Sequence, residues 1–135
     1  MIVLDSSFLV AYHNESDVNH DAALRLMERL VDGAWGDALL PEGVFIELVT
    51  VLAARRDVAV ARTAGELLLD AREVELVPST ELFADAWKIF ANQERFVLSF
   101  VDASIVALAR QRGTPHVASF DRDFATVAGI ELIDR

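Results

Sequence analysis

The sequence has no cysteine and only one lysine, and both shortages narrow what the chain can do. The absence of cysteine excludes disulfide bonds and thiolate catalysis. Lys88 is the only lysine, so 11 of the 12 basic residues are arginine. Arginine makes bidentate contacts with phosphate and carboxylate groups, and the scarce positive charge is therefore of a kind suited to recognition.

Positive charge is also outnumbered by negative charge. The 22 acidic and 12 basic residues give a formal net charge of −10 at pH 7. Such an acidic chain is poorly suited to broad, nonspecific binding of nucleic acid. A metal site would account for part of the acidic excess, and the composition leaves room for a small, localised contact with nucleic acid.

Long apolar runs are absent as well. The apolar runs that occur, such as residues 67–69 and 105–109, fall far below the roughly 18 to 20 residues that cross a bilayer. The first residues lack the basic flank and cleavage site of a signal peptide. With 135 residues that are 53% hydrophobic, we expect a single domain over residues 1–135 and, by default, a soluble cytoplasmic protein.

Short apolar runs alternate with amphipathic segments along the chain, and proline or glycine stands at several boundaries. We expect strands at residues 2–4, 35–40, 73–77, 116–120 and 130–133. We expect helices at residues 6–14, 17–32, 41–56, 57–71, 79–92 and 98–112, and a short one at 121–128. Strands separated by helices form βαβ units, which predicts an α/β fold with a mainly parallel sheet of four to five strands flanked by helices.

Acids follow two of the predicted strands. The Ile-Val-Leu run before Asp5 is typical of a strand covered on both faces, so Asp5 should lie where open α/β sheets bind ligands. The alternative is that Asp5 only caps the next helix. Asp121 and Asp123 follow a later strand, and for them the alternative is a pair of first-turn acids favoured by the helix dipole.

Two further acids fall on predicted helices among apolar or neutral neighbours. No lysine or arginine stands three or four positions from Glu47 or Asp102. An unpaired carboxylate in a buried stripe is costly, and it is relieved by pairing, protonation or a bound metal. A buried ion pair with a distant arginine is the alternative. Glu42 competes with Glu47 for a role, although Glu42 is also explained as a first-turn acid.

A parallel sheet can bring these acids together at one edge. Several carboxylates there would repel one another without a cation, and hard oxygen ligands suit Mg²⁺ or Mn²⁺ better than zinc. Such a site suits hydrolysis of a phosphodiester, because the metal polarises a phosphate oxygen and lowers the pKa of a water molecule. The histidines show no metal-ligand spacing, and we assign them to surface or packing positions: His13, His20 and His116.

The same stretches resemble the ordered acidic motifs of PIN-domain nucleases. They are Val-Leu-Asp-Ser-Ser at 3–7, Val-Phe-Ile-Glu-Leu at 44–48, Val-Asp-Ala at 101–103 and Ser-Phe-Asp-Arg-Asp-Phe at 119–124. In its length and its compact single domain, the chain is most similar to the VapC-type toxins of toxin–antitoxin pairs. The resemblance spans the whole chain and implies a three-layer PIN-like α/β domain.

Carried over by position, the resemblance implies a catalytic quartet of Asp5, Glu47, Asp102 and Asp121. The three aspartates would hold the metal, and Glu47 would bind or orient the attacking water. Asp123 matches an auxiliary acid that also serves the metal.

The resemblance implies further features of the site and its partners. Ser7 matches the small polar residue that follows the first acid. Cleavage of RNA with Mg²⁺ or Mn²⁺, a homodimer and a cognate antitoxin at the site are also implied. Arg110, Arg112 and Arg122 lie near the motifs and are candidate phosphate contacts, with solvated helix-end arginines as the alternative.

We therefore predict a metal-dependent endoribonuclease that is the toxin of a toxin–antitoxin pair. One alternative is a catalytically inactive PIN-like module that binds a protein. Another is a phosphatase or phosphotransfer domain with Asp5 as the nucleophile. That chemistry usually needs an acid two residues later and a lysine at the phosphate, whereas this chain has Ser7 there and its one lysine in an unrelated helix.

Overall fold

A five-stranded sheet forms the centre of the computed structural model, which describes residues 1–135. Its strands are β1 (Ile2–Leu4), β2 (Ala38–Pro41), β3 (Val74–Val77), β4 (His116–Ala118) and β5 (Glu131–Ile133). The strand order is β3-β2-β1-β4-β5, and every neighbouring pair is parallel. The predicted α/β class is confirmed, and the sheet is parallel throughout.

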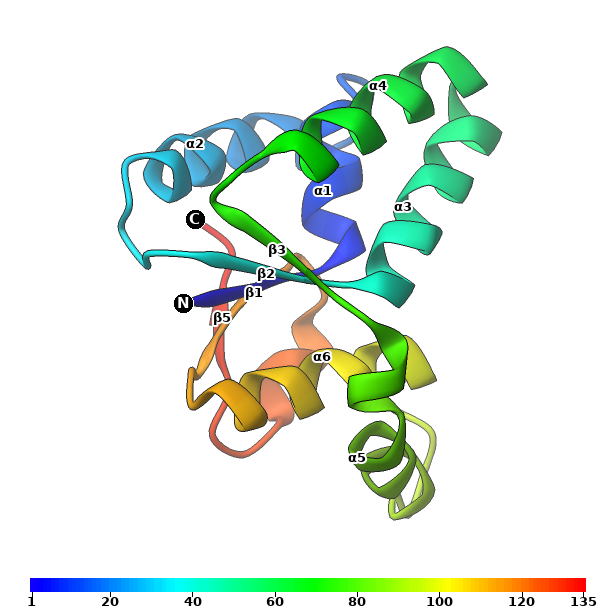
Figure 1. The fold of residues 1–135 in the computed structure, drawn as a ribbon, viewed down its shortest axis with the longest axis vertical. Coiled ribbons are helices and arrows are strands. Elements are labelled where there is room, and N and C mark those ends of the chain that lie inside the picture. The colour runs from blue at the N-terminus through cyan, green and yellow to red at the C-terminus, as the bar shows by residue number, and fades with distance from the viewer.

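Helices cover both faces of this sheet and complete three layers (Figure 1). They are α1 (Ser6–His13), α2 (His20–Val31), α3 (Glu42–Arg55), α4 (Val58–Asp70), α5 (Ser79–Ala91) and α6 (Phe100–Arg112), with a short 3₁₀ helix, η1 (Arg122–Thr126). Helices α1 to α4 lie on one face, whereas α5 and α6 lie on the other (Figure 1). None of them has both the length and the apolar character to span a membrane.

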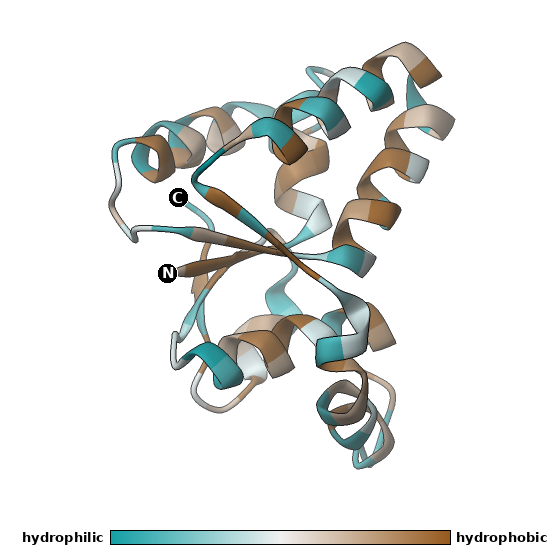
Figure 2. Cartoon of the chain, viewed as in Figure 1, coloured by the Kyte–Doolittle hydropathy of each residue, from teal (hydrophilic) through white to brown (hydrophobic).

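The central position of β1 explains its uninterrupted apolar sequence. Ile2, Val3 and Leu4 are each at most 1% exposed, because β2 and β4 flank the strand and helices cover both its faces. β3 lies at an edge of the sheet and leaves Glu75 and Leu76 exposed. Figure 2 shows hydrophobic residues on the central strands and on parts of the surrounding helices.

Observed helix boundaries differ from the predicted ones mainly at their starts. Helix α2 begins at His20 and not at Asp17, because Asp17 Oδ1 accepts the Asn19 N–H at 2.8 Å and stabilises a turn there. Helix α6 begins at Phe100, after its cap at Ser99. The predicted helix at 121–128 is the shorter 3₁₀ helix η1.

Candidate active site

The ends of β1 and β4 meet at the point where the chain changes direction across the sheet. From β1 the chain continues to β2 on one side, while β4 lies on the other side of β1. Open α/β sheets bind ligands outside the carboxyl ends of the strands at such a switch point. Asp5 follows β1, and Asp121 follows β4 by three residues. The sheet topology therefore brings Asp5 and Asp121, the first and last acids of the predicted quartet, close together.

Asp5 is a buried carboxylate held by hydroxyl groups. It is 4% exposed, and its Oδ2 accepts hydrogen bonds from Ser7 Oγ at 2.7 Å and Ser119 Oγ at 2.6 Å. Burial raises the pKa of Asp5, the two serine hydrogen bonds oppose that rise, and the nearby charge of Glu47 adds to it. Asp5 occupies the N-cap position of α1, but its side chain makes no capping hydrogen bond. The capping alternative therefore does not explain its side chain.

The same hydroxyls join the ends of the two strands. Ser119 is fully buried, and its Oγ also accepts the N–H of Asp121 at 2.9 Å. Ser7 Oγ lies 3.1 Å from Ser119 Oγ and accepts the N–H of Phe120 at 3.0 Å. Sequence reasoning assigned no role to Ser119. The available signal was a polar residue directly after the buried end of a predicted strand.

Asp102 belongs to a capping box at the start of α6. Its Oδ2 accepts the Ser99 N–H at 2.9 Å, and Ser99 Oγ accepts the Asp102 N–H at 3.1 Å. Burial raises the pKa of Asp102 to about 6; hydrogen bonds from Ser99 oppose the rise, and the charges of Asp5 and Asp121 add to it. The two aspartates are therefore near enough to Asp102 to disfavour its ionisation. Asp102 is both the third helical residue of this capping box and a member of the acidic group.

Glu47 corrects one prediction. We expected a carboxylate in a buried stripe, but Glu47 is exposed and its Oε1 accepts a hydrogen bond from Ser6 Oγ at 2.6 Å. The buried stripe of α3 consists of Val44, Leu48 and Leu52, four residues apart, and Glu47 stands one position away from it. The bond to Ser6 still holds Glu47 beside the first turn of α1. Ser6 is a second contact that sequence reasoning missed.

The remaining predicted acids differ in position. Asp121 caps η1, and its Oδ1 accepts the Asp123 N–H at 2.9 Å. The Asp123 side chain is exposed and makes no hydrogen bond with the other acids. This position fits the alternative that Asp123 is a first-turn acid. Glu42 occupies the first turn of α3 and makes no hydrogen bond with the Asp5 network.

The three candidate arginines contact other parts of the chain. Arg110 and Arg112 lie on the last turn of α6, and eight residues of helix separate Arg110 from Asp102 by about 12 Å. Arg110 donates to the carbonyl of Ala128 at 3.4 Å, and Arg112 forms an ion pair with Glu75. Arg122 pairs with Asp134 at 3.3 Å. Their proposed contact with phosphate stays a prediction.

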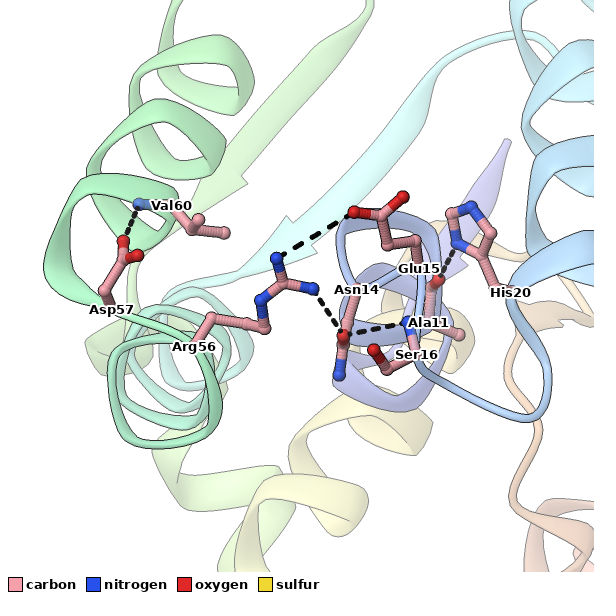
Figure 3. Close-up of polar contacts among 8 residues, drawn as sticks. All are labelled: Ala11, Asn14, Glu15, Ser16, His20, Arg56, Asp57 and Val60. Carbon is pink, nitrogen blue, oxygen red and sulfur yellow. Dashed lines mark hydrogen bonds and ion pairs between the residues drawn. The ribbon is translucent and has the colours of Figure 1, made fainter.

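The histidines also lie apart from the acids. His13 is half-buried, and burial lowers its pKa. The His20 ring contacts the carbonyl of Ala11 at 2.7 Å, as Figure 3 shows, and His116 lies 3.5 Å from Glu131.

The oxygen donors at the switch point fit a hard divalent cation in chemistry. Burial raises the pKa values of Asp5 and Asp102, and no basic side chain pairs with Asp5, Asp102 or Asp121. No three acidic or histidine side chains converge closely enough to chelate an ion as they stand. Each carboxylate accepts a hydrogen bond from a hydroxyl or a backbone N–H, so a cation bound here would have to replace some of these bonds.

Two hollows border α3 on the face that α1 to α4 cover. The larger, of about 730 Å³, lies between α3 and α4, is lined mainly by apolar side chains and contains none of the predicted acids of the site. The smaller, of about 230 Å³, lies between α1 and α3 and includes Ser6, Ser7 and Glu47. The size of a hollow therefore does not indicate the site; the polar hollow adjoins it.

Comparison with known families matches residues 2–130 to the PIN domain. The match covers nearly the whole chain, including the ends of β1 and β4. The chain belongs to the PIN domain family.

Individual relatives agree with this assignment. The 23S rRNA-specific endonuclease VapC20 of two Mycobacterium tuberculosis strains is 31% identical over 138 residues, covering 98% of each chain. The crystal structure of M. tuberculosis VapC20, described as a sarcin–ricin loop cleaving toxin, has a TM-score of 0.82 at 26% identity over 95% of both chains.

Two more distant structures share the fold. A toxin–antitoxin complex from Klebsiella pneumoniae has a TM-score of 0.67 at 16% identity, covering 97% of this chain and 96% of that one. VapBC2 from Rickettsia felis, bound to a DNA fragment from its promoter, has a TM-score of 0.69 at 14% identity, covering 98% of both chains.

The raised pKa of Asp102 predicts a pH-dependent stability in metal-free protein. Its folded pKa is about 6 against an ordinary value of 3.8, so the folded state binds more protons between these values. The free energy of unfolding should therefore fall as the pH rises through this window. We expect Asp102→Asn to flatten this fall, because the amide does not titrate and its oxygen can still accept the Ser99 N–H.

Thermal unfolding in EDTA across that pH range measures the effect. Asp70→Asn is the matched control, because Asp70 is an exposed acid at the end of α4. Asp5 contributes in the same direction, so part of the slope should persist in Asp102→Asn. Identical pH profiles for wild type and Asp102→Asn would contradict the assignment.

Proposed function

We propose that this chain is a metal-dependent endoribonuclease and the toxin of a toxin–antitoxin pair. The observation that carries the proposal is the gathering of Asp5, Asp102 and Asp121 at the switch point of a PIN-domain sheet. A relative named as a 23S rRNA-specific endonuclease, alike over 98% of both chains, supports RNA as the substrate. Ribosomal RNA is therefore the first substrate to test.

The residues divide the work by position. Asp5, Asp102 and Asp121 would hold Mg²⁺ or Mn²⁺, which when bound polarises a phosphate oxygen and activates a water. Ser7 and Ser119 orient the Asp5 carboxylate, since both donate to its Oδ2. That arrangement also argues against Asp5 as a nucleophile, because its buried oxygen is already engaged twice.

Glu47 would orient the attacking water in this mechanism. Ser6 holds Glu47 Oε1 and leaves Oε2 without a side-chain partner. Because Glu47 is exposed beside the first turn of α1, Oε2 would accept a hydrogen bond from the attacking water and orient it. Glu42 lacks such a hydroxyl partner, which favours Glu47 for the role.

Neutralising a metal-holding carboxylate should abolish cleavage while preserving the fold. We expect Asp5→Asn and Asp121→Asn to lower the rate of RNA cleavage by about a hundredfold or more, since the amide oxygen keeps the hydrogen bonds but loses the charge. Asp70→Asn should cleave like wild type. Gel assays with ribosomal RNA, with EDTA and with Mg²⁺ or Mn²⁺ added back, measure the rates.

Cleavage that survives EDTA would contradict the metal dependence. Full activity in Asp5→Asn would contradict the assigned site. A wild-type protein that binds a protein partner but never cleaves RNA would be the inactive binding module.

A cognate antitoxin is the proposed protein partner. The description of the M. tuberculosis relative as a toxin supports the pairing. The hollow between α3 and α4 supplies apolar surface, from Phe45, Val49 and Leu69 among others, for an apolar segment of another chain. Helix α3 would separate such a segment from the polar hollow that contains Glu47.

A homodimer is also proposed, with an exposed aromatic patch as its contact surface. The patch consists of Phe83, Trp87, Phe90, Phe96 and Phe100, from α5, α6 and the loop between them. Phe83, Trp87 and Phe96 are 61%, 53% and 77% exposed, and their rings contact those of Phe90 or Phe100 in tilted or edge-on arrangements at centroid distances of 5.5 to 6.5 Å. An exposed aromatic surface of this kind is typical of a protein interface.

Replacing Trp87 by glutamate should therefore separate the dimer. We expect wild type to sediment with twice the mass of one chain and Trp87→Glu with the mass of one, because a charge buried in an apolar contact is costly. Val31→Glu is the control, since Val31 is 72% exposed on α2, outside the patch. A monomeric wild type, or a dimeric Trp87→Glu, would contradict the proposal.

A further inference from the structure

Helices α1 and α3 leave the carboxyl edge of the sheet on the same face (Figure 1). They border a polar groove. Its α3 wall carries Glu47, Val51 and Arg55, spaced four residues apart and therefore on one stripe of the helix. Its α1 wall includes Ser6 and Ser7, which bind the carboxylates of Glu47 and Asp5. The groove thus runs from the candidate catalytic groups to Arg55, about 12 Å along the helix from Glu47.

The far end of the groove is closed by the loop between α1 and α2. Arg56 ties this loop to the end of α3, donating to Asn14 Oδ1 at 3.2 Å and pairing with Glu15 at 3.9 Å (Figure 3). Asn14 Oδ1 in turn accepts the N–H of Ser16 at 3.2 Å, which stabilises the turn. Arg56 is therefore accounted for as a structural residue that fixes the wall of the groove.

Arg55, the neighbouring residue, has no such explanation. It is exposed and lines the groove, and its side chain forms neither a hydrogen bond nor an ion pair. Asp17 also lines the groove, but its Oδ1 accepts the Asn19 N–H, and Asp17 lies beyond ion-pair distance of Arg55. Arg55 is the one basic residue among those that line the groove.

We infer that Arg55 binds a phosphate group of the RNA substrate, at a position along the strand away from the bond that is cut. The inference rests on the proposed ribonuclease function. A chain with a net charge of −10 needs a local cation to hold RNA beside its acids, and a guanidinium group offers paired donors to phosphate oxygens. The groove would direct the strand from Glu47 toward Arg55.

The test compares Arg55→Ala, Arg55→Lys and a matched control, Arg72→Ala. Arg72 is exposed and precedes β3 at the amino edge of the sheet, so its loss changes the net charge equally without touching the groove. The probe is a fluorescein-labelled single-stranded RNA, and its binding is followed by anisotropy in EDTA over a series of salt concentrations. Cleavage of ribosomal RNA with Mn²⁺ gives kcat and KM, and thermal unfolding checks the fold.

We expect Arg55→Ala to weaken RNA binding about tenfold, as the loss of one charge-assisted hydrogen-bonded contact would. The slope of log affinity against log salt should become shallower by about 0.7, the value for one phosphate on a single strand. KM should rise more than kcat falls, Arg55→Lys should recover part of the affinity, and Arg72→Ala should match wild type.

Two results would overturn the inference, and they are distinguishable. If wild type binds and cleaves RNA while Arg55→Ala and Arg72→Ala share its affinity and salt slope, Arg55 holds no phosphate and the ribonuclease function stands. If wild type neither binds nor cleaves RNA, the proposed function fails and the inference fails with it.

Discussion

The hydrogen bonds from Ser7 and Ser119 to the buried carboxylate of Asp5 are the contacts on which the candidate site depends. Asp5 has no basic partner, so hydroxyl donors are what orient it at 4% exposure. Ser119 also accepts the N–H of Asp121, which couples the end of β1 to the residues after β4. The parallel pairing of these two strands places the donors there. The hydrogen bonds of Ser119 therefore connect the pairing of β1 and β4 to the arrangement of the acids.

The acids at this edge carry an electrostatic cost that the fold itself does not require. Burial and the charges of Asp5 and Asp121 raise the pKa of Asp102 to about 6, and no lysine or arginine relieves them. Natural chains break local rules chiefly at functional sites, where the cost serves binding or chemistry. A divalent cation would remove that cost and would use the same oxygen atoms. The electrostatic cost of the acidic group therefore supports the proposed nuclease function.

The sequence predicted the sheet and the strand-end acids because both depend on local patterns. Short apolar runs between helices predict parallel strands, and an acid directly after such a run must lie at the sheet edge. The exposure of Glu47 was not predictable in this way, because a shift of one residue along α3 moves a side chain from the buried stripe to the surface. Ser119 was missed because its partner, Asp5, lies 114 residues away. The groove at Arg55 likewise exists only once α1, α3 and their connecting loop are packed together.

Calorimetric titration of Mn²⁺ into metal-free protein at neutral pH tests the central claim most directly. If Asp5, Asp102 and Asp121 form one metal site, wild type and Asp70→Asn should bind Mn²⁺ alike, and Asp102→Asn should bind at least about tenfold more weakly. Repeated near pH 6, the titration should also release protons on binding, because the Asp102 carboxyl group, with a pKa of about 6, is then partly protonated. No binding by wild type, or equal binding by Asp102→Asn, would contradict the account and leave these carboxylates as caps and hydrogen-bond acceptors.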